Sequence, residues 1–246
     1  MDRMIYTAMT GAKHTLEQQA TVSHNLANAS TTGFRAQIDA FRAVPVEGAP
    51  LPTRAFVVDS TTGTDFRAGV IQQTGRPLDV AIEGDGWFAV QAEDGSEAYT
   101  RNGSFELDEN GVLRTAGGLI VQGDGGALSI PPGSNLAVGR DGTISLLPDG
   151  SAATGLTTVG RLKLVNPPPG ELARGDDGLF RLKDGGAAET DPDVKVLSGA
   201  LESSNVNVVD AMVDMITLAR QFEMQMKILQ HAEGNDSKAA QLLSLS

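Results

Sequence analysis

The stretch that decides the fold is residues 207–229, which read NVVDAMVDMITLARQFEMQMKIL. Apolar residues recur in it at alternating steps of four and three, the period of an amphipathic helix and of a heptad repeat. This stripe consists of Val208, Met212, Met215, Ala219, Phe222, Met226 and Leu229. Asn207 can cap the first turn, because its side-chain oxygen can accept hydrogen bonds from free backbone N–H groups. We predict a helix that starts after Asn207 and breaks at Gly234-Asn235-Asp236, with a short amphipathic tail beyond.

A weaker stripe of the same period lies at the other end of the chain. It consists of Ile5, Met9, Ala12 and Leu16, and it is resumed at Leu26. We predict a second helix that ends between Asn28 and Thr32, where Gly33 can adopt a left-handed conformation. Two interpretations of the stripes stay open. Both helices pack on the middle of the chain, or they pair with each other or with further copies.

The residues between the two helical arms have the composition of a β-rich body. All 11 Pro and all but three of the 29 Gly lie between positions 45 and 199. Such breakers favour short strands joined by frequent turns. We therefore predict an α+β chain, in which helical arms flank an antiparallel domain shaped like a sandwich or a barrel.

The predicted boundaries follow these shifts in composition. The N-terminal arm covers residues 1–33, an extended linker 34–75, the central β domain 76–199 and the C-terminal arm 200–246. We expect residues 1–33 and 206–246 to form one inner coiled-coil domain.

The composition argues against several classes of function. The 246 residues hold 19 Lys and Arg against 31 Asp and Glu, a net charge of −12, so phosphate backbones would repel the chain. The absence of Cys removes disulfides and zinc–thiolate sites, and three His leave little material for a metal site or a triad. No apolar run approaches the roughly 18 residues of a membrane span, and the first ten residues lack the apolar core of a signal peptide. We expect no enzymatic activity, cofactor, metal, nucleic acid or membrane insertion.

Three Gly- and Asp-rich stretches look like ligand loops but are better explained as turns. Gly84-Asp-Gly86 and Gly123-Asp-Gly125-Gly126 open no predicted helix and lack the Lys-Ser/Thr of a phosphate loop, so we interpret both as hairpin turns. Asp108-Glu-Asn-Gly111 lacks the third acidic ligand and the closing Glu of a calcium loop. We interpret it as the turn of a hairpin formed by residues 105–107 and 112–113.

Four stretches together resemble the flagellar rod and hook family. They are SHNLANASTTGFR at 23–35, RPLDVAIEGDGWF at 76–88, YTRNGSF at 99–105, and a segment that begins SGALESSNV at 198–206 and continues to Met224. His24 stands where the family usually has Asn. Within the family the chain is most similar to proximal-rod subunits, and distal-rod subunits come next. The hook protein usually has a larger insertion than this length allows.

The resemblance implies a structural subunit of the basal-body rod, exported by the flagellar type III apparatus without signal cleavage into the rod that spans the periplasm. In such proteins the terminal helices form an inner coiled-coil layer around the export channel, and the β-rich middle lies outside. The implied partners are further copies and the neighbouring proximal- and distal-rod subunits, and the implied mechanism is assembly into a helical tube that transmits torque. The resemblance adds Asn25 and Asn28 to the two stripes as expected assembly residues.

The residues alone leave two functions of other classes open. One is a binding or adhesion module whose helical arms form an oligomerisation stalk with a fixed number of copies. The other is a hydrolase on a β scaffold, which would need a pocket with converging acidic groups.

Overall fold

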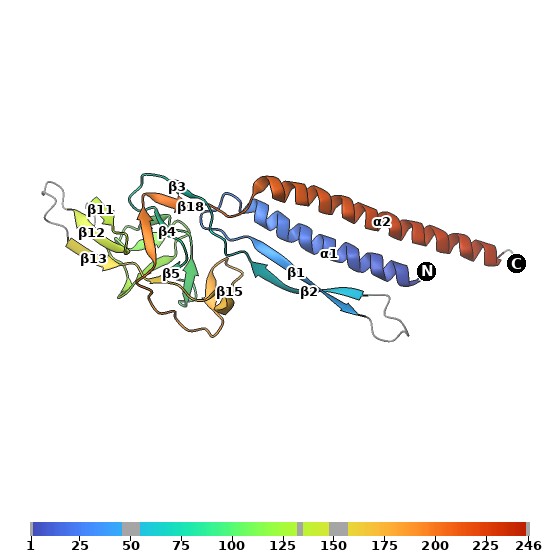
Figure 1. The fold of residues 1–246 in the computed structure, drawn as a ribbon, viewed down its shortest axis with the longest axis horizontal. Coiled ribbons are helices and arrows are strands. Elements are labelled where there is room, and N and C mark those ends of the chain that lie inside the picture. Colours follow the sequence, from blue (N-terminus) through green and yellow to red (C-terminus); the bar gives the residue numbers. More distant parts are fainter. Residues whose placement is uncertain (1, 46–54, 132–134, 148–156, 245–246) are drawn as a thin grey trace. The chain divides into compact units, whose positions relative to one another are not determined.

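A computed structural model describes residues 2–45, 55–131, 135–147 and 157–244, and divides the chain into two compact units. The helical unit comprises residues 1–29, 36–65 and 206–246, and the β unit comprises residues 30–35 and 66–205. Figure 1 labels their elements. The predicted α+β class is confirmed, because helices occupy both ends of the described chain and the strands between them pair antiparallel.

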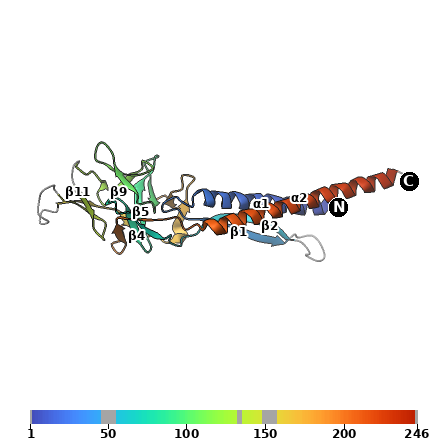
Figure 2. The ribbon, with the colours of Figure 1, turned by 90° about the horizontal axis from the view of Figure 1, so that it is seen from above.

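Two long helices form most of the helical unit. Helix α1 is Asp2–Ala27 and helix α2 is Val208–Ser244. They run antiparallel side by side, and α2 continues past the N-terminal end of α1 (Figure 2). As predicted, Asn207 caps α2, since its Oδ1 accepts the backbone N–H of Val209 at 3.0 Å. Neither helix, over its described residues, is apolar enough to cross a membrane.

The predicted break at Gly234 is wrong, because α2 continues through it to Ser244. An interior Gly costs a helix only about 1 kcal/mol relative to Ala. No Pro follows to end the helix, and Ala232, just before Gly234, is buried.

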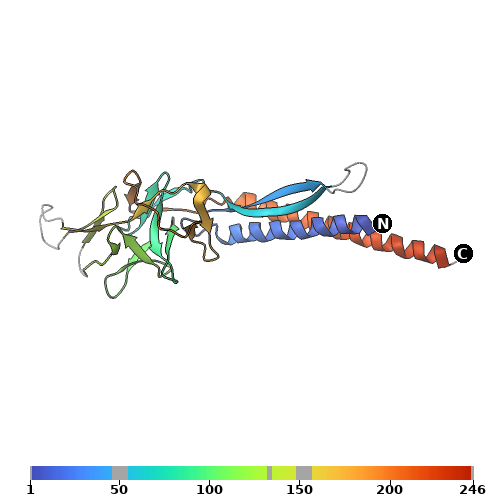
Figure 3. The same cartoon turned by 90° about the horizontal axis from the view of Figure 1, so that it is seen from below.

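Residues 34–75, predicted to be an extended linker, contain a long hairpin. Strand β1, Gln37–Pro45, pairs antiparallel with β2, Ala55–Thr64, with a register shift between Ala40 and Phe41. The hairpin lies along α1 (Figure 3). The His14 ring contacts Phe41 at 5.6 Å between centroids, and Thr21 Oγ1 donates to Asp39 Oδ1 at 2.8 Å.

The β unit holds the remaining strands. Their bounds are β3 Ile71–Gln73, β4 Val80–Glu83, β5 Trp87–Gln91, β6 Glu97–Thr100, β7 Phe105–Leu107, β8 Leu113–Thr115, β9 Ile120–Gly123, β10 Gly126–Ala127, β11 Asn135–Val138, β12 Thr143–Leu147, β13 Thr157–Arg161, β14 Leu164–Val165, β15 Leu172–Arg174, β16 Phe180–Leu182, β17 Lys195–Ser198 and β18 Ala200–Glu202, with one short 3-10 helix at Pro169–Glu171. A nine-stranded sheet has the order β15-β16-β6-β5-β9-β8-β7, with β10 added at β9 and β14 at β5. Strands β11-β12-β13, β17-β4 and β18-β3 form smaller sheets.

The predicted turns are mostly confirmed. Residues 108–111 join β7 to β8 as a hairpin, and residues 123–126 join β9 to β10. Gly84-Asp-Gly86 is different, because β4 pairs with β17 while β5 pairs with β6 and β9. This turn therefore passes the chain between two sheets, and its interpretation as a hairpin turn is wrong. A further Asp-Gly pair of the kind that favours a turn, Asp149-Gly150, lies outside the described residues.

The hydrophobic core of the β unit consists of two clusters. The larger is centred on Phe88, Val90 and Phe105, and the smaller one contains Trp87 and Phe180, whose rings are 4.6 Å apart. Alternate residues of β5 thus serve different clusters, as expected for a strand buried on both sides.

The unit boundaries also differ from the predicted ones. Strand β18 and residues 203–205 belong to the β unit, although the sequence places the C-terminal arm from residue 200. Residues 30–35 belong to the β unit as well, because their backbone bonds to residues 202–205.

Candidate assembly interface

The two helices meet along a seam in which most of the buried residues are small. Ala12 and Thr15 of α1 are buried, and so are Ala211, Leu218 and Ala232 of α2. The three α2 residues, with Gln225 between them, recur every seven positions, as in a heptad. Small side chains let the two helix backbones approach closely.

Gln225 is the polar member of this seam. Its Nε2 donates to Thr15 Oγ1 at 3.2 Å, and Thr15 Oγ1 donates to the Gly11 carbonyl at 3.0 Å. A Cβ at Gly11 would lie 3.1 Å from Gln225 Nε2, so the glycine leaves the room that the amide occupies. A hydrogen-bonded amide inside an apolar seam fixes the register of the two helices.

The predicted stripes lie partly in this seam and partly beside it. Ala12 is buried; Ile5, Leu26, Met215, Ala219, Phe222 and Leu229 are half-buried; Met9, Leu16, Val208, Met212 and Met226 are exposed. The sequence reasoning missed Ala211, Leu218, Gln225 and Ala232, because it followed the 4,3 stripe that begins at Val208, and these four residues lie beside that stripe. Their seven-residue spacing was the available signal.

The first turns of α2 carry a second apolar side. Val209, Val213 and Ile216 are 68%, 56% and 56% exposed. At 100° per residue they point away from Leu218, and thus away from α1. On α1, Tyr6, Met9 and Leu16 are likewise exposed. A helix that is apolar on nearly all sides is normally buried, so these outer sides of the helical unit are suited to contact another protein.

Asn25 and Asn28 fix the exit from α1. The Asn25 side-chain amide donates from Nδ2 to the Gln37 carbonyl at 2.8 Å, and its Oδ1 accepts the Gln37 N–H at 2.8 Å. It thereby pairs with β1 as a neighbouring strand would. Asn28 Nδ2 donates to the His24 carbonyl at 2.9 Å, which satisfies a carbonyl of the last helical turn.

We expect Asn25→Ala to loosen the start of the hairpin. The change removes the hydrogen bonds that Asn25 makes to the N–H and to the carbonyl of Gln37, and each such bond is worth about 1 kcal/mol. Amide exchange at Gln37 should accelerate, while exchange in the α1–α2 seam stays unchanged. Ser23→Ala, an exposed position on the same helix, is the control. Unchanged exchange at Gln37 would contradict this role of Asn25.

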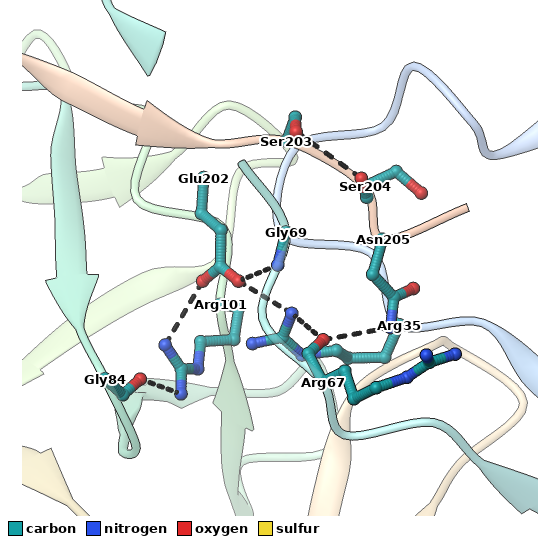
Figure 4. A network of polar contacts seen from close by, with 9 residues as sticks. All are labelled: Arg35, Arg67, Gly69, Gly84, Arg101, Glu202, Ser203, Ser204 and Asn205. Carbon is teal, nitrogen blue, oxygen red and sulfur yellow. Dashed lines mark hydrogen bonds and ion pairs between the residues drawn. The ribbon is translucent and has the colours of Figure 1, made fainter. Parts of the chain in front are cut away.

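A buried ionic cluster in the β unit was not found from the sequence (Figure 4). Glu202 and Arg35 are each 1% exposed, and Glu202 Oε1 pairs with Arg35 Nη1 at 2.6 Å. Glu202 Oε2 accepts from Arg101 Nη1 at 3.1 Å, and Oε1 also accepts the Gly69 N–H at 2.8 Å. Burial lowers the pKa of Arg101 to about 10, against the raising effect of the Glu202 carboxylate, so the guanidinium stays charged at neutral pH.

The cluster carries more positive than negative charge. One carboxylate faces two guanidinium groups, and Nε and Nη2 of Arg35 and Nε of Arg101 are buried without a hydrogen-bond partner among the described residues. Arg35 and Glu202 both lie in stretches that carry the family resemblance, and each stands next to an apolar residue. A charged residue in that setting was the available signal for a buried ionic contact.

The possible ligand loops have structural roles. Asp108 Oδ1 accepts the N–H groups of Asn110 and Val112, each at 2.9 Å, and Oδ2 accepts from Arg114 Nε at 2.9 Å. The backbone hydrogen bond from Val112 is the main cause that holds the pKa of Asp108 below its ordinary value. Among the described residues, no three His, Asp or Glu side chains are grouped to hold a metal ion.

Three family models match separate parts of this chain. The model "Flagella basal body rod protein" matches residues 5–35, which include most of α1 and end at Arg35. The "Flagellar hook protein FlgE/F/G D1 domain" matches residues 81–146 of the β unit. The "Flagellar basal body rod FlgEFG protein C-terminal" matches residues 197–242, which hold Glu202 and most of α2.

The paired terminal helices, the β unit between them and these matches define a class of structural subunit. The chain belongs to the family of flagellar basal-body rod proteins, which are not enzymes. Within this family it is FlgF-like. It is 52% identical over 252 positions to the flagellar basal-body rod protein FlgF of Escherichia coli (strain K12), and 50% identical to that of Salmonella typhimurium (strain LT2), with all of each chain covered. FlgG of Buchnera aphidicola subsp. Schizaphis graminum is 32% identical over 90% of this chain and 92% of its own.

The predictions of a rod protein most similar to FlgF, and of a protein without enzymatic activity, are therefore confirmed. The comparisons do not favour an adhesion module with an oligomerisation stalk.

Proposed function

We propose that this rod subunit assembles through the outer sides of its paired helices into the proximal rod, a helical tube whose inner coiled-coil layer surrounds the export channel. The observation that supports this is the exposed apolar side of α2 at Val209, Val213 and Ile216. These side chains face away from α1, which supports a contact with another subunit at this side.

The two outer sides of the helical unit differ from each other. The α1 side presents Tyr6, Met9 and Leu16, whereas the α2 side presents branched Val and Ile. A contact between two different surfaces is heterologous, and repeating it builds an open helical stack unless the rotation happens to close. In the proposed rod, this helical stack forms a tube that can transmit torque. The predicted assembly residues Val208, Met212 and Met226 belong to the same proposal.

The proposed partners are further copies of this chain, the neighbouring proximal- and distal-rod subunits, and the flagellar type III export apparatus. The proposed location is the part of the basal-body rod that spans the periplasm. The FlgF and FlgG relatives are both named basal-body rod proteins, which supports neighbours of this kind.

Ile216→Asp tests the proposed assembly surface. In the single subunit the introduced carboxylate would be solvated, so the melting temperature should change little. In an assembled rod the carboxylate would be buried without a partner, at a cost of several kcal/mol. We therefore expect stable protein, no rods in isolated basal bodies and non-motile cells.

The matched control is Gln221→Asp, an exposed polar position on another side of the same helix, which should leave motility intact. Normal rods with Ile216→Asp would contradict the proposed assembly surface.

A further inference from the structure

The chain passes between the helical unit and the β unit at four places. These crossings lie after residues 29, 35, 65 and 205. Force carried along the chain from one unit to the other passes through these four crossings. The residues that hold each crossing on the β-unit side therefore matter for a protein under load.

The first two crossings are held at Glu202. Residues 30–35 lie between them, and the Gly33 N–H donates to the Glu202 backbone carbonyl at 2.8 Å. Arg35 Nη1 pairs with the Glu202 carboxylate at 2.6 Å. A Cβ at Gly33 would collide with the Arg101 backbone, and its φ of 68° is in the left-handed region, so the segment fits there only with Gly.

The third crossing is held at the same carboxylate. Residues 66–69 follow it, and the Gly69 N–H donates to Glu202 Oε1 at 2.8 Å. The Arg67 carbonyl accepts from Arg35 Nη1 at 2.8 Å and from Asn205 Nδ2 at 3.0 Å.

The fourth crossing begins three residues after Glu202. The Asn205 N–H donates to the Phe34 carbonyl at 3.3 Å, which joins the last crossing to the first two. The β-unit segments at the four crossings, residues 30–35, 66–69 and 202–205, therefore share one set of contacts within the β unit.

Two arginines tie this set to the sheets of the β unit. Arg101, next to the end of β6, pairs with Glu202 and donates from Nη2 to the Gly84 carbonyl at 2.7 Å, in the turn between β4 and β5. Arg174, on β15, donates from Nη1 to the Arg35 carbonyl at 2.7 Å, and its guanidinium lies 4.6 Å from the centroid of the Phe34 ring.

We propose that the Glu202 cluster, defined as Arg35, Gly69, Arg101 and Glu202, is the junction through which load passes between the two units. The inference rests on the proposed function, because the load arises from rotation of the proposed rod. Buried hydrogen bonds to an ionised carboxylate are directional and strong, and salt screens them little. The Glu202 carboxylate thus links residues 30–35 and 66–69 to Arg101, and its own strand β18 leads to the fourth crossing.

Glu202→Gln in the full chain tests this junction by amide exchange. It keeps the side-chain shape but leaves two buried guanidinium groups without a counter-charge. The amides of Gly33, Gly69 and Asn205 should exchange at least tenfold faster, while those of β5 and β6 keep their rates. Glu83→Gln is the control, since it removes an exposed pair with Arg140. Unchanged rates at the three amides, or an equal increase throughout the β unit, would overturn the proposal.

The second measurement is swimming speed against medium viscosity. Cells with Glu202→Gln should swim like the parent strain in dilute medium but stop at a lower viscosity. A role in stability alone would lower the amount of rods without this dependence on load, and a parental viscosity curve would also overturn the proposal. If the Glu202→Gln protein is degraded, Arg35→Lys, which keeps the charge but loses the planar fork, replaces it in both measurements. Failure of the proposed function is a separate result, namely normal rods with Ile216→Asp.

Discussion

Gly103→Ala should lower the free energy of unfolding of the β unit by about 3 kcal/mol or more, among the largest effects expected of a single methyl group. A Cβ at this position would overlap the Val80 carbonyl oxygen and lie 3.1 Å from Cε2 of Phe88. Neither neighbour can move away easily, because Val80 and Phe88 are buried in the main core cluster. The Gly103 carbonyl also accepts the Val80 N–H at 2.9 Å, so a shift of the backbone would break a hydrogen bond.

The measurement is urea unfolding followed by fluorescence of Trp87, the only Trp of the chain, which is buried in the β unit. Gly125→Ala is the matched control, since no heavy atom lies within 4 Å of its added Cβ and its φ is not positive. The free energy of unfolding of Gly125→Ala should differ from that of the parent protein by no more than about 0.5 kcal/mol. Equal midpoints for the two variants would show that the close approach at Gly103 is not a constraint.

Leu218→Asp should separate α1 from α2. Leu218 is 9% exposed and lies in the seam, between Ala211 and Gln225 of the same heptad position. A carboxylate there is either desolvated or protonated, and both cost several kcal/mol relative to a packed leucine. Isolated helices are marginal without packing, so much of the helical signal should be lost along with the pairing.

Circular dichroism at 222 nm measures this loss, while Trp87 fluorescence should report an unchanged β unit. Ile216→Asp provides the comparison within the same helix, because it points away from α1 and should leave the helical signal of the single subunit intact. If both variants kept their helical signal, the seam would not be the contact that stabilises the helices.

The helices could be predicted from the sequence because their signals are local. Asn207 lies directly before a periodic apolar run, and it caps α2 as expected. The side of each helix that faces its partner was harder to predict, because the seam uses Ala211 and Gln225, which lie beside the apolar stripe that the spacing selects. Close packing favours small residues, and hydrophobicity alone does not report on it.

The hairpin and the Glu202 cluster depend on contacts between distant residues. Strand β2 contains the polar run Asp59-Ser-Thr-Thr-Gly63, which shows no apolar alternation, so pairing with β1 decides its conformation. Arg101 and Glu202 are 101 positions apart, and no spacing rule connects them. The family resemblance indicated that their stretches matter, but only the fold shows that they meet.

The pairing of α1 with α2 also determines the order of folding. Thr15 and Gln225 touch although they are 210 residues apart in the chain. Contacts of such separation form late, because a long loop must close first, whereas the short hairpins of the β unit close between near neighbours. During synthesis α1 is made before α2, so it must wait for its partner. A nascent chain therefore lacks the finished helical pair, and with it the proposed assembly surface of α2, until α2 has been synthesised.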